Sequence, residues 1–207
     1  MMHSQLTFST YYELYKQGHS SITPQLATTI KAVEIALQKK SVTLLDPQQV
    51  AGVEDLFITD ERVSDLTVIA TMTQLKSLSL WDTCITNDSL SPLSSLVKLQ
   101  ELDLDGTKID DLSHLSSMTS LLKLSLNDTL VYDLSPISSL SNLLSLHLSG
   151  CLQLKDIGAV ASLANLLELA LDETKVSDIS PVYHLTNLKM VVLAETKVAP
   201  EAIQKLM

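Results

Sequence analysis

Asp103, Ser125 and His147 have the residue types of a hydrolytic triad, and they follow one another at intervals of 22 residues. In a working triad the histidine lies between the other two residues, because it accepts the serine proton while the acid orients its ring. On three successive strands this order would place the serine in the middle, with the carboxylate about 10 Å from the imidazole. The order argues against a hydrolase, and we expect this chain to have no catalytic residues and not to be an enzyme.

Signatures of cofactor and metal chemistry are also missing from the sequence. It contains no glycine-rich phosphate loop and no closely spaced set of histidine and cysteine ligands. Calcium would bind only weakly to a strip of acidic residues without a loop that directs several oxygens to one ion. We therefore expect no cofactor and no metal site, and we expect the chain to act by binding.

The 22-residue interval belongs to a repeat that runs from about Val53 to Val198. The copies, aligned on their first apolar residue, begin at Val53, Leu75, Leu99, Leu121, Leu143, Leu166 and Leu188. A period of this length is typical of a solenoid, because one unit cannot bury its apolar face alone and neighbouring units must cover it. The sequence thus predicts one continuous domain that recognises a partner through its surface.

The third copy shows the local pattern most clearly. Leu102 and Leu104 alternate with Glu101, Asp103 and Asp105, which is the period of two expected of a strand with one buried and one wet face. One such strand per copy predicts a parallel sheet. Serine hydroxyls followed by proline are expected to cap short helical turns on the return path. These pairs are Ser91-Pro92, Ser135-Pro136 and Ser180-Pro181.

The copies resemble leucine-rich repeats, and the Asp-Leu-Ser-Pro element at 133–136 and Asp-Ile-Ser-Pro at 178–181 are similar to the short, internalin-like bacterial class. The resemblance covers about two thirds of the chain. It implies an α/β solenoid with a curved parallel sheet on the concave face and helical or 3-10 turns on the convex face. It also implies a ladder of threonines bonded to the turn backbone, from which Glu61 and Cys151 depart. The ladder residues are Thr83, Thr107, Thr129, Thr174 and Thr196.

Three segments are predicted: a helical N-terminal cap over 1–52, seven repeats over 53–198, and a short C-terminal helical cap over 199–207. Thr23 and Pro24 predict a helix start, and a spacing typical of a capping box, from Thr10 to Glu13, predicts an earlier short helix. Val42 to Leu45 is a candidate edge strand. Four aromatic residues of the cap either pack onto its second helix or the first strand, or form a docking patch. They are Phe8, Tyr11, Tyr12 and Tyr15.

The two cysteines are predicted to be unpaired. Cys84 falls just after the threonine column and Cys151 lies in that column three copies later, about 14 Å away at one strand spacing per copy. A disulfide needs its Cα atoms within about 7 Å. We expect Cys151 to be a small buried residue in the place of a threonine, and Cys84 to be exposed.

Composition restricts the environment in which the chain works. The chain has 207 residues, 45% of them hydrophobic, and a formal net charge of −10. It has no run of about 18 apolar residues and no secretory signal pattern. The sequence therefore predicts a soluble, cytoplasmic protein, with export by a route that needs no classical signal as the alternative.

Positions three, five, seven and eight of each copy are expected to project from the concave face or its rim, and we call them the display positions. Eleven of these 28 residues are acidic, and Lys123 is the only basic one. The acidic residues are Asp55, Asp60, Asp82, Glu101, Asp103, Asp105, Asp128, Glu168, Asp172, Glu173 and Glu195. Such a face attracts basic partners and repels nucleic acids and anionic membranes. The alternative is that the acids solvate the solenoid and that position eight holds turn residues.

The predicted partner-binding patch combines these acids with aromatic anchors. Its residues are Phe57, Trp81, Glu101, Asp103, Asp105, Lys123, Asn127 and His147. Packing of the two aromatic residues against each other is the alternative. The sequence predicts a protein-interaction module that binds a basic protein or peptide, with neither nucleic acid nor membrane as partner and with its oligomeric state undetermined. A translocated bacterial effector or internalin-like factor that engages a host protein is the second hypothesis, suggested by the resemblance alone.

Overall fold

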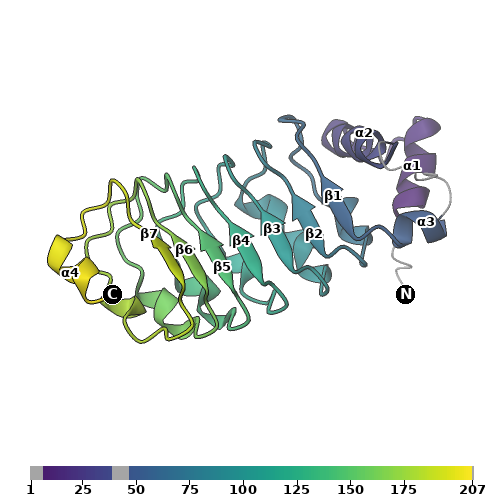
Figure 1. The fold of residues 1–207 in the computed structure, drawn as a ribbon. Coiled ribbons are helices and arrows are strands. Elements are labelled where there is room, and N and C mark those ends of the chain that lie inside the picture. Colours follow the sequence, from purple (N-terminus) through teal and green to yellow (C-terminus); the bar gives the residue numbers. More distant parts are fainter. Residues whose placement is uncertain (1–6, 39–46, 207) are drawn as a thin grey trace.

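The computed structural model describes residues 7–38 and 47–206, and it has the elongated, stacked form of a solenoid (Figure 1). Helices lie at the N-terminal end and α4 (Pro200–Gln204) lies at the opposite end. Between them, seven parallel strands form one sheet in chain order. The strands are β1 (Asp55–Phe57), β2 (Ser77–Ser79), β3 (Glu101–Asp103), β4 (Lys123–Ser125), β5 (Ser145–His147), β6 (Glu168–Ala170) and β7 (Met190–Val192). The predicted solenoid with a parallel sheet is confirmed.

One apolar residue at the centre of each strand points into the core. Leu102 lies between Leu78 and Leu124 in the strand register, and each of these side chains is at most 2% exposed. The residues on either side of Leu102 in β3, Glu101 and Asp103, are only partly buried. The alternation seen in the sequence therefore separates a leucine core from an open sheet face.

Short 3-10 helices form the other layer of the stack. They are η1 (Ile69–Thr71), η2 (Asn87–Ser95), η3 (Ser113–Leu115), η4 (Ser135–Ser139), η5 (Gly158–Ser162) and η6 (Ser180–Val182). The predicted capping by serine is wrong. Ser135 donates both its N–H and its hydroxyl to Asp133, at 2.8 and 2.6 Å, and these bonds lower the pKa of that carboxylate. The turn at Ser135 therefore begins with aspartate as the acceptor, because the carboxylate of Asp133 can reach both the N–H and the hydroxyl of Ser135.

The threonine ladder implied by the resemblance is present. Thr107 donates its hydroxyl to the carbonyl of Leu104 at 2.6 Å, and the other four threonines make the equivalent bond. Cys151 is fully buried in the same column, and its Sγ contacts the carbonyl of Leu126 at 3.2 Å. Cys84 is exposed, and both cysteines are free. These observations confirm the interpretation of the two cysteines.

A second ladder, which was not predicted, links consecutive copies before β5, β6 and β7. The Nδ2 atoms of Asn142, Asn165 and Asn187 donate to backbone carbonyls of the preceding copy at 2.8 to 3.0 Å. Because each bond joins two neighbouring copies, this ladder fixes the spacing of the copies in the segment that leads from each 3-10 helix back to the sheet.

Helices α1 (Phe8–Lys16), α2 (Pro24–Gln38) and α3 (Pro47–Ala51) cover the N-terminal end. The predicted cap at Thr10 is wrong, because Thr7 precedes α1 and its Oγ1 accepts from the N–H of Thr10. Phe8 and Tyr12 are buried, which favours the packing interpretation of the aromatic residues. The strand expected over 42–45 lies outside the described residues. None of the described helices is long and apolar enough to cross a bilayer.

A polar contact joins the first two helices inside this cap. Tyr12 donates its hydroxyl to Glu34 at 2.8 Å, and Lys31 pairs with the other oxygen of Glu34 at 2.7 Å. Burial and the bond to Glu34 raise the pKa of Tyr12 to about 12. Burial opposes ionisation of Glu34, but its hydrogen bonds from Lys31 and Tyr12 outweigh that effect and lower its pKa. The bonds from Lys31 and Tyr12 thus hold the buried carboxylate in its charged form.

From the second copy on, position eight, which lies three residues after the end of each strand, has a left-handed backbone. The φ angle is +55° at Asp82 and Asp128, +69° at Gly106 and +71° at Gly150. A Cβ atom at Gly106 would collide with the carboxylate of Asp82, and one at Gly150 with the carboxylate of Asp128. From copy two to copy five acid and glycine alternate, and each glycine leaves room for the acid of the preceding copy, whereas copies six and seven both carry glutamate. The shared left-handed backbone supports the interpretation of position eight as a turn position.

Replacing a central strand leucine should test the core assignment. We expect Leu102→Ala or Leu124→Ala to lower the free energy of unfolding by about 2 to 5 kcal/mol, because each leaves a cavity in a packed column. Lys108→Ala, at an exposed site of the same stack, should change it by less than about 0.5 kcal/mol. Urea unfolding curves measure all three, and equal losses would contradict the assignment.

Two glycines with the same backbone conformation allow a matched test of position eight. Gly18 has φ +65° and no atom within 4 Å of the place where a Cβ atom would lie, whereas Gly106 faces Asp82. Gly18→Ala should lower the free energy of unfolding by about 1 to 2 kcal/mol, because alanine disfavours the left-handed backbone at that position. Gly106→Ala should lower it by more. In an Asp82→Gly background the cost of Gly106→Ala should fall to that of Gly18→Ala. A cost that does not depend on Asp82 would rule out the collision.

Candidate functional site

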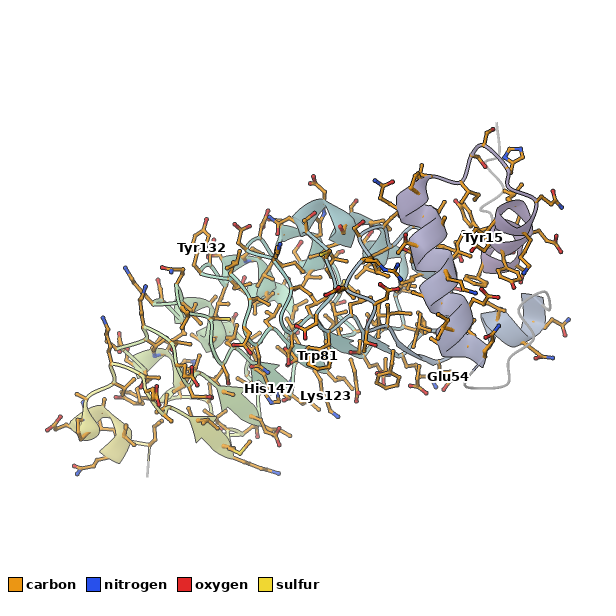
Figure 2. The ribbon with its side chains drawn as sticks, turned by 90° about the horizontal axis from the view of Figure 1, so that it is seen from above. Tyr15, Glu54, Trp81, Lys123, Tyr132 and His147 are labelled. Carbon is orange, nitrogen blue, oxygen red and sulfur yellow. The ribbon has the colours of Figure 1, made fainter. Side chains whose placement is uncertain are left out.

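The concave face contains a hollow of about 290 Å³ in front of β1 to β5. Six of the eight residues predicted for the binding patch line it: Phe57, Glu101, Asp103, Asp105, Lys123 and His147. The rest of the lining consists of serines and of the leucines of β2 to β4. Figure 2 shows Trp81, Lys123 and His147 on the side of the molecule that carries the strands, and Tyr132 on the opposite side. Trp81 and Asn127 lie outside the lining.

The one basic display residue is already paired. Lys123 contacts Glu101 at 2.9 Å across β3 and β4, and both side chains are about half exposed to solvent. The bond to Glu101 raises the pKa of Lys123, so the ammonium group stays charged. Exposed pairs of this kind contribute little to stability, so a partner can open this one at small cost.

Asp103 presents a carboxylate that is held in place at the edge of the hollow. Its Oδ2 accepts from the hydroxyl of Ser79 at 2.7 Å, and its Oδ1 accepts from the N–H of Asp105 at 3.0 Å. Each carboxylate oxygen has two acceptor sites, so both can accept a further donor. A basic group in the hollow would therefore meet an oriented carboxylate.

The display residues at position seven form a chain of hydrogen bonds along the rim. Asp105 accepts from the N–H of Asn127 at 2.7 Å and from its Nδ2 at 2.9 Å. Asn127 in turn accepts from the N–H of Ser149 at 2.8 Å, and Ser149 donates its hydroxyl to Asp172 at 2.6 Å. These side chains satisfy backbone groups of the next copy, so Asp105 and Asn127 have a structural task that the sequence analysis missed.

The register confirms the order that argued against a triad. Ser125 pairs with Asp103 on one side and with His147 on the other. The hydroxyl of Ser125 receives a bond from Asn127 at 3.1 Å, and His147 Nε2 lies 3.1 Å from the hydroxyl of Ser145. The three triad-type residues therefore bond to other neighbours. Within the described residues no group of three or more histidine, cysteine or acidic side chains is arranged to hold a metal ion.

Two large apolar side chains are exposed beside these polar groups. Phe57 is 60% exposed and lines the hollow, while Trp81 is 50% exposed at position seven of the next copy. Burying an aromatic ring on binding releases a large apolar area from water, and exposed aromatic residues are common anchors of interfaces. The hollow therefore combines an apolar end at β1 with carboxylates further along the sheet.

Several of the acidic residues at position eight already have another role. Asp60 there is paired with Arg62, whose guanidinium donates to both carboxylate oxygens at 2.9 and 2.7 Å, and this bond lowers the pKa of Asp60. The backbone constraint described above also gives Asp82 and Asp128 a turn role. The acids that face the hollow are those at positions three, five and seven of β3 and its following turn.

Comparisons with known proteins agree with this architecture. A family model for leucine-rich repeats in two copies matches residues 73–117. An internalin (inlF) from Listeria monocytogenes is 30% identical, with a TM-score of 0.76, over 90% of this chain and 54% of the internalin. The present chain thus spans about half the length of that internalin. Comparison with curated proteins gives no match.

Two further solved structures are similar. Internalin C2 from Listeria monocytogenes is 27% identical, with a TM-score of 0.56, over 83% of this chain and 93% of that protein. A plant peptide hormone receptor, RGFR1 in complex with RGF2, is 18% identical with a TM-score of 0.58, over 75% and 31% of the two chains, and shares the fold alone. The chain is a leucine-rich repeat protein whose repeats and fold are similar to those of internalins.

Proposed function

We propose that the chain is a protein-interaction module that binds a basic protein or peptide segment through its concave face. The observation that carries the proposal is the hollow in front of β1 to β5, where exposed Phe57 adjoins Glu101, Asp103 and Asp105. A segment with an arginine or lysine beside an apolar residue would fit both parts of this surface. The proposal assigns no catalytic step, no cofactor and no metal to the chain.

Electrostatics favours a basic partner over other classes. The chain has 24 acidic and 14 basic residues, and the one basic residue in the hollow is paired with Glu101. Fields of this kind raise the rate at which cations arrive and repel the phosphates of nucleic acids and anionic lipids.

The similar proteins support the general class of function. The plant receptor is named as a peptide hormone receptor and was solved with RGF2 bound, which is a use of this fold for recognition. Solenoids present a long continuous surface, which suits the binding of extended protein segments. The basic character of the partner rests on the charges of this chain and not on its relatives.

Binding of a synthetic arginine- and lysine-rich peptide tests the proposal. Trp81 is the only tryptophan and is half exposed, so its fluorescence should report binding at the rim. We expect the affinity to fall as salt is added, because the charges are screened. A peptide of the same length rich in glutamate and aspartate should not bind.

A matched pair of double variants distinguishes the effect of charge on the concave face from the effect of the total charge of the chain. Glu101→Gln with Asp103→Asn keeps the side-chain shapes, removes two charges from the hollow and frees Lys123, so the affinity should drop about tenfold or more. Glu13→Gln with Asp88→Asn removes the same charge from exposed sites elsewhere and should change the affinity less than about twofold. Equal losses in the two double variants would refute binding at the concave face.

The similarity to the Listeria internalins supports a second candidate, a translocated bacterial effector or internalin-like factor that engages a host protein. The two candidates use the same face but act in different places, the first in the cytoplasm of the producing cell. Fractionation of producing cells and their medium, followed by immunodetection of the chain, distinguishes them. A chain found only in the cytosol would remove the second candidate.

A further inference from the structure

One row of side chains across the hollow alternates between large and small residues. At position five of the first five copies it contains Phe57, Ser79, Asp103, Ser125 and His147, one residue from each of β1 to β5. All five line the hollow. Phe57 is 60% exposed, whereas Ser79 beside it is 7% exposed and donates its hydroxyl to Asp103. The serines therefore leave gaps between the larger side chains, which occur on every second strand.

The hollow is longer across the strands than along them. Its lining reaches from Phe57 to His147, which are four strand spacings of about 4.8 Å apart, or roughly 19 Å. Except for Asp105, the lining residues lie at positions three to five, which span about 7 Å along a strand. An α-helix with its side chains is about 10 to 12 Å wide. The hollow therefore suits a narrower, extended segment that runs across the strands.

The spacing of the large side chains distinguishes between two extended conformations. Phe57 and Asp103 are two strands apart, about 9.6 Å. In a β-strand the side chains on one face recur every second residue, at about 6.7 Å, and after four residues at about 13 Å. A polyproline II helix has three residues per turn and a rise of about 3.1 Å, so its side chains recur on one face at about 9.3 Å. Of the two, the polyproline II repeat matches the row.

The chemistry at these two positions agrees with such a segment. Phe57 presents an exposed ring, and grooves lined by aromatic residues bind polyproline II segments, which lose little conformational entropy on binding. Asp103 presents a carboxylate, and in the described part of the chain no lysine or arginine pairs with it, whereas Glu101 is paired with Lys123. An arginine of the partner can therefore bond to Asp103 without displacing a cation of the chain.

We propose that the bound segment is a polyproline II helix that lies across β1 to β5, with an apolar residue against Phe57 and an arginine three residues away at Asp103. The segment follows the long axis of the stack, because the strands lie side by side along that axis (Figure 1). His147 lies two strands beyond Asp103 and so faces the next turn of the same helix. This inference rests on the proposed function and adds the conformation of the partner and the spacing of its two contact residues.

Synthetic peptides of equal length and composition test the spacing. Each contains one leucine, one arginine and the same number of prolines, with leucine and arginine two, three or four positions apart and in either order. Isothermal titration calorimetry with the full 207-residue chain should show the tightest binding at a spacing of three. We expect it to be about fivefold tighter than at two or four, because the other spacings lose one of the two contacts.

The arginine- and lysine-rich peptide described above tests the proposed function separately. If that peptide binds while the proline peptides bind with equal affinity at all spacings, or do not bind, this inference is wrong and the proposed function stands. If the arginine- and lysine-rich peptide does not bind either, both are refuted.

Single variants identify the two contacts. Phe57→Ala and Asp103→Asn each remove one contact, so the preference for a spacing of three should fall below about twofold. Tyr132→Ala is the matched control, because Tyr132 is 59% exposed and lies on the opposite side of the molecule (Figure 2). Its loss should leave the preference unchanged. A preference that survives in Phe57→Ala, or that disappears in Tyr132→Ala, would overturn the proposal.

Discussion

The burial of leucine between neighbouring copies is the constraint on which the rest of the structure depends. A single copy has too little apolar surface to fold alone, and each strand leucine becomes fully buried only when a neighbouring copy or the helical cap covers it on both sides. Leu102 and its neighbours in the register lose nearly all contact with water, whereas Val191 at the end of the stack does not. The same requirement explains the helical cover over β1.

Fixed leucine columns force the residues between them onto one wet surface. Part of that surface serves the stack itself: Asp105 and Asn127 satisfy the backbone of the next copy, and position eight accommodates a left-handed turn. What remains around the hollow is Phe57, Asp103 and the pair of Lys123 with Glu101. Two of these four side chains are carboxylates, Asp103 is oriented by two hydrogen bonds and Phe57 is exposed, which is why we place the binding of a basic segment there.

The sequence was sufficient for features that follow from periodicity. The strands, the leucine core and the position of Ser125 between Asp103 and His147 all depend on register, which the repeat determines. The threonine ladder followed from the resemblance to leucine-rich repeats. Bonds from an amide to a carboxylate were missed although they recur with the repeat, because spacing alone does not show which group a carboxylate reaches. The bond from Ser135 to Asp133 and the rim chain through Asp105 are of this kind. The start of α1 was predicted at Thr10 and lies at Thr7, because the two threonines lie one turn apart.

Cysteine cross-linking across the concave face tests most directly whether stacked leucines display one continuous surface. In a chain without its native cysteines, Ser125→Cys with His147→Cys places two thiols on neighbouring strands about 4.8 Å apart. Asp103→Cys with His147→Cys places them two strands apart, beyond the reach of a disulfide. We expect rapid oxidation of the first pair and none within the second. Equal oxidation of both pairs, or of neither, would contradict the register and the face built on it.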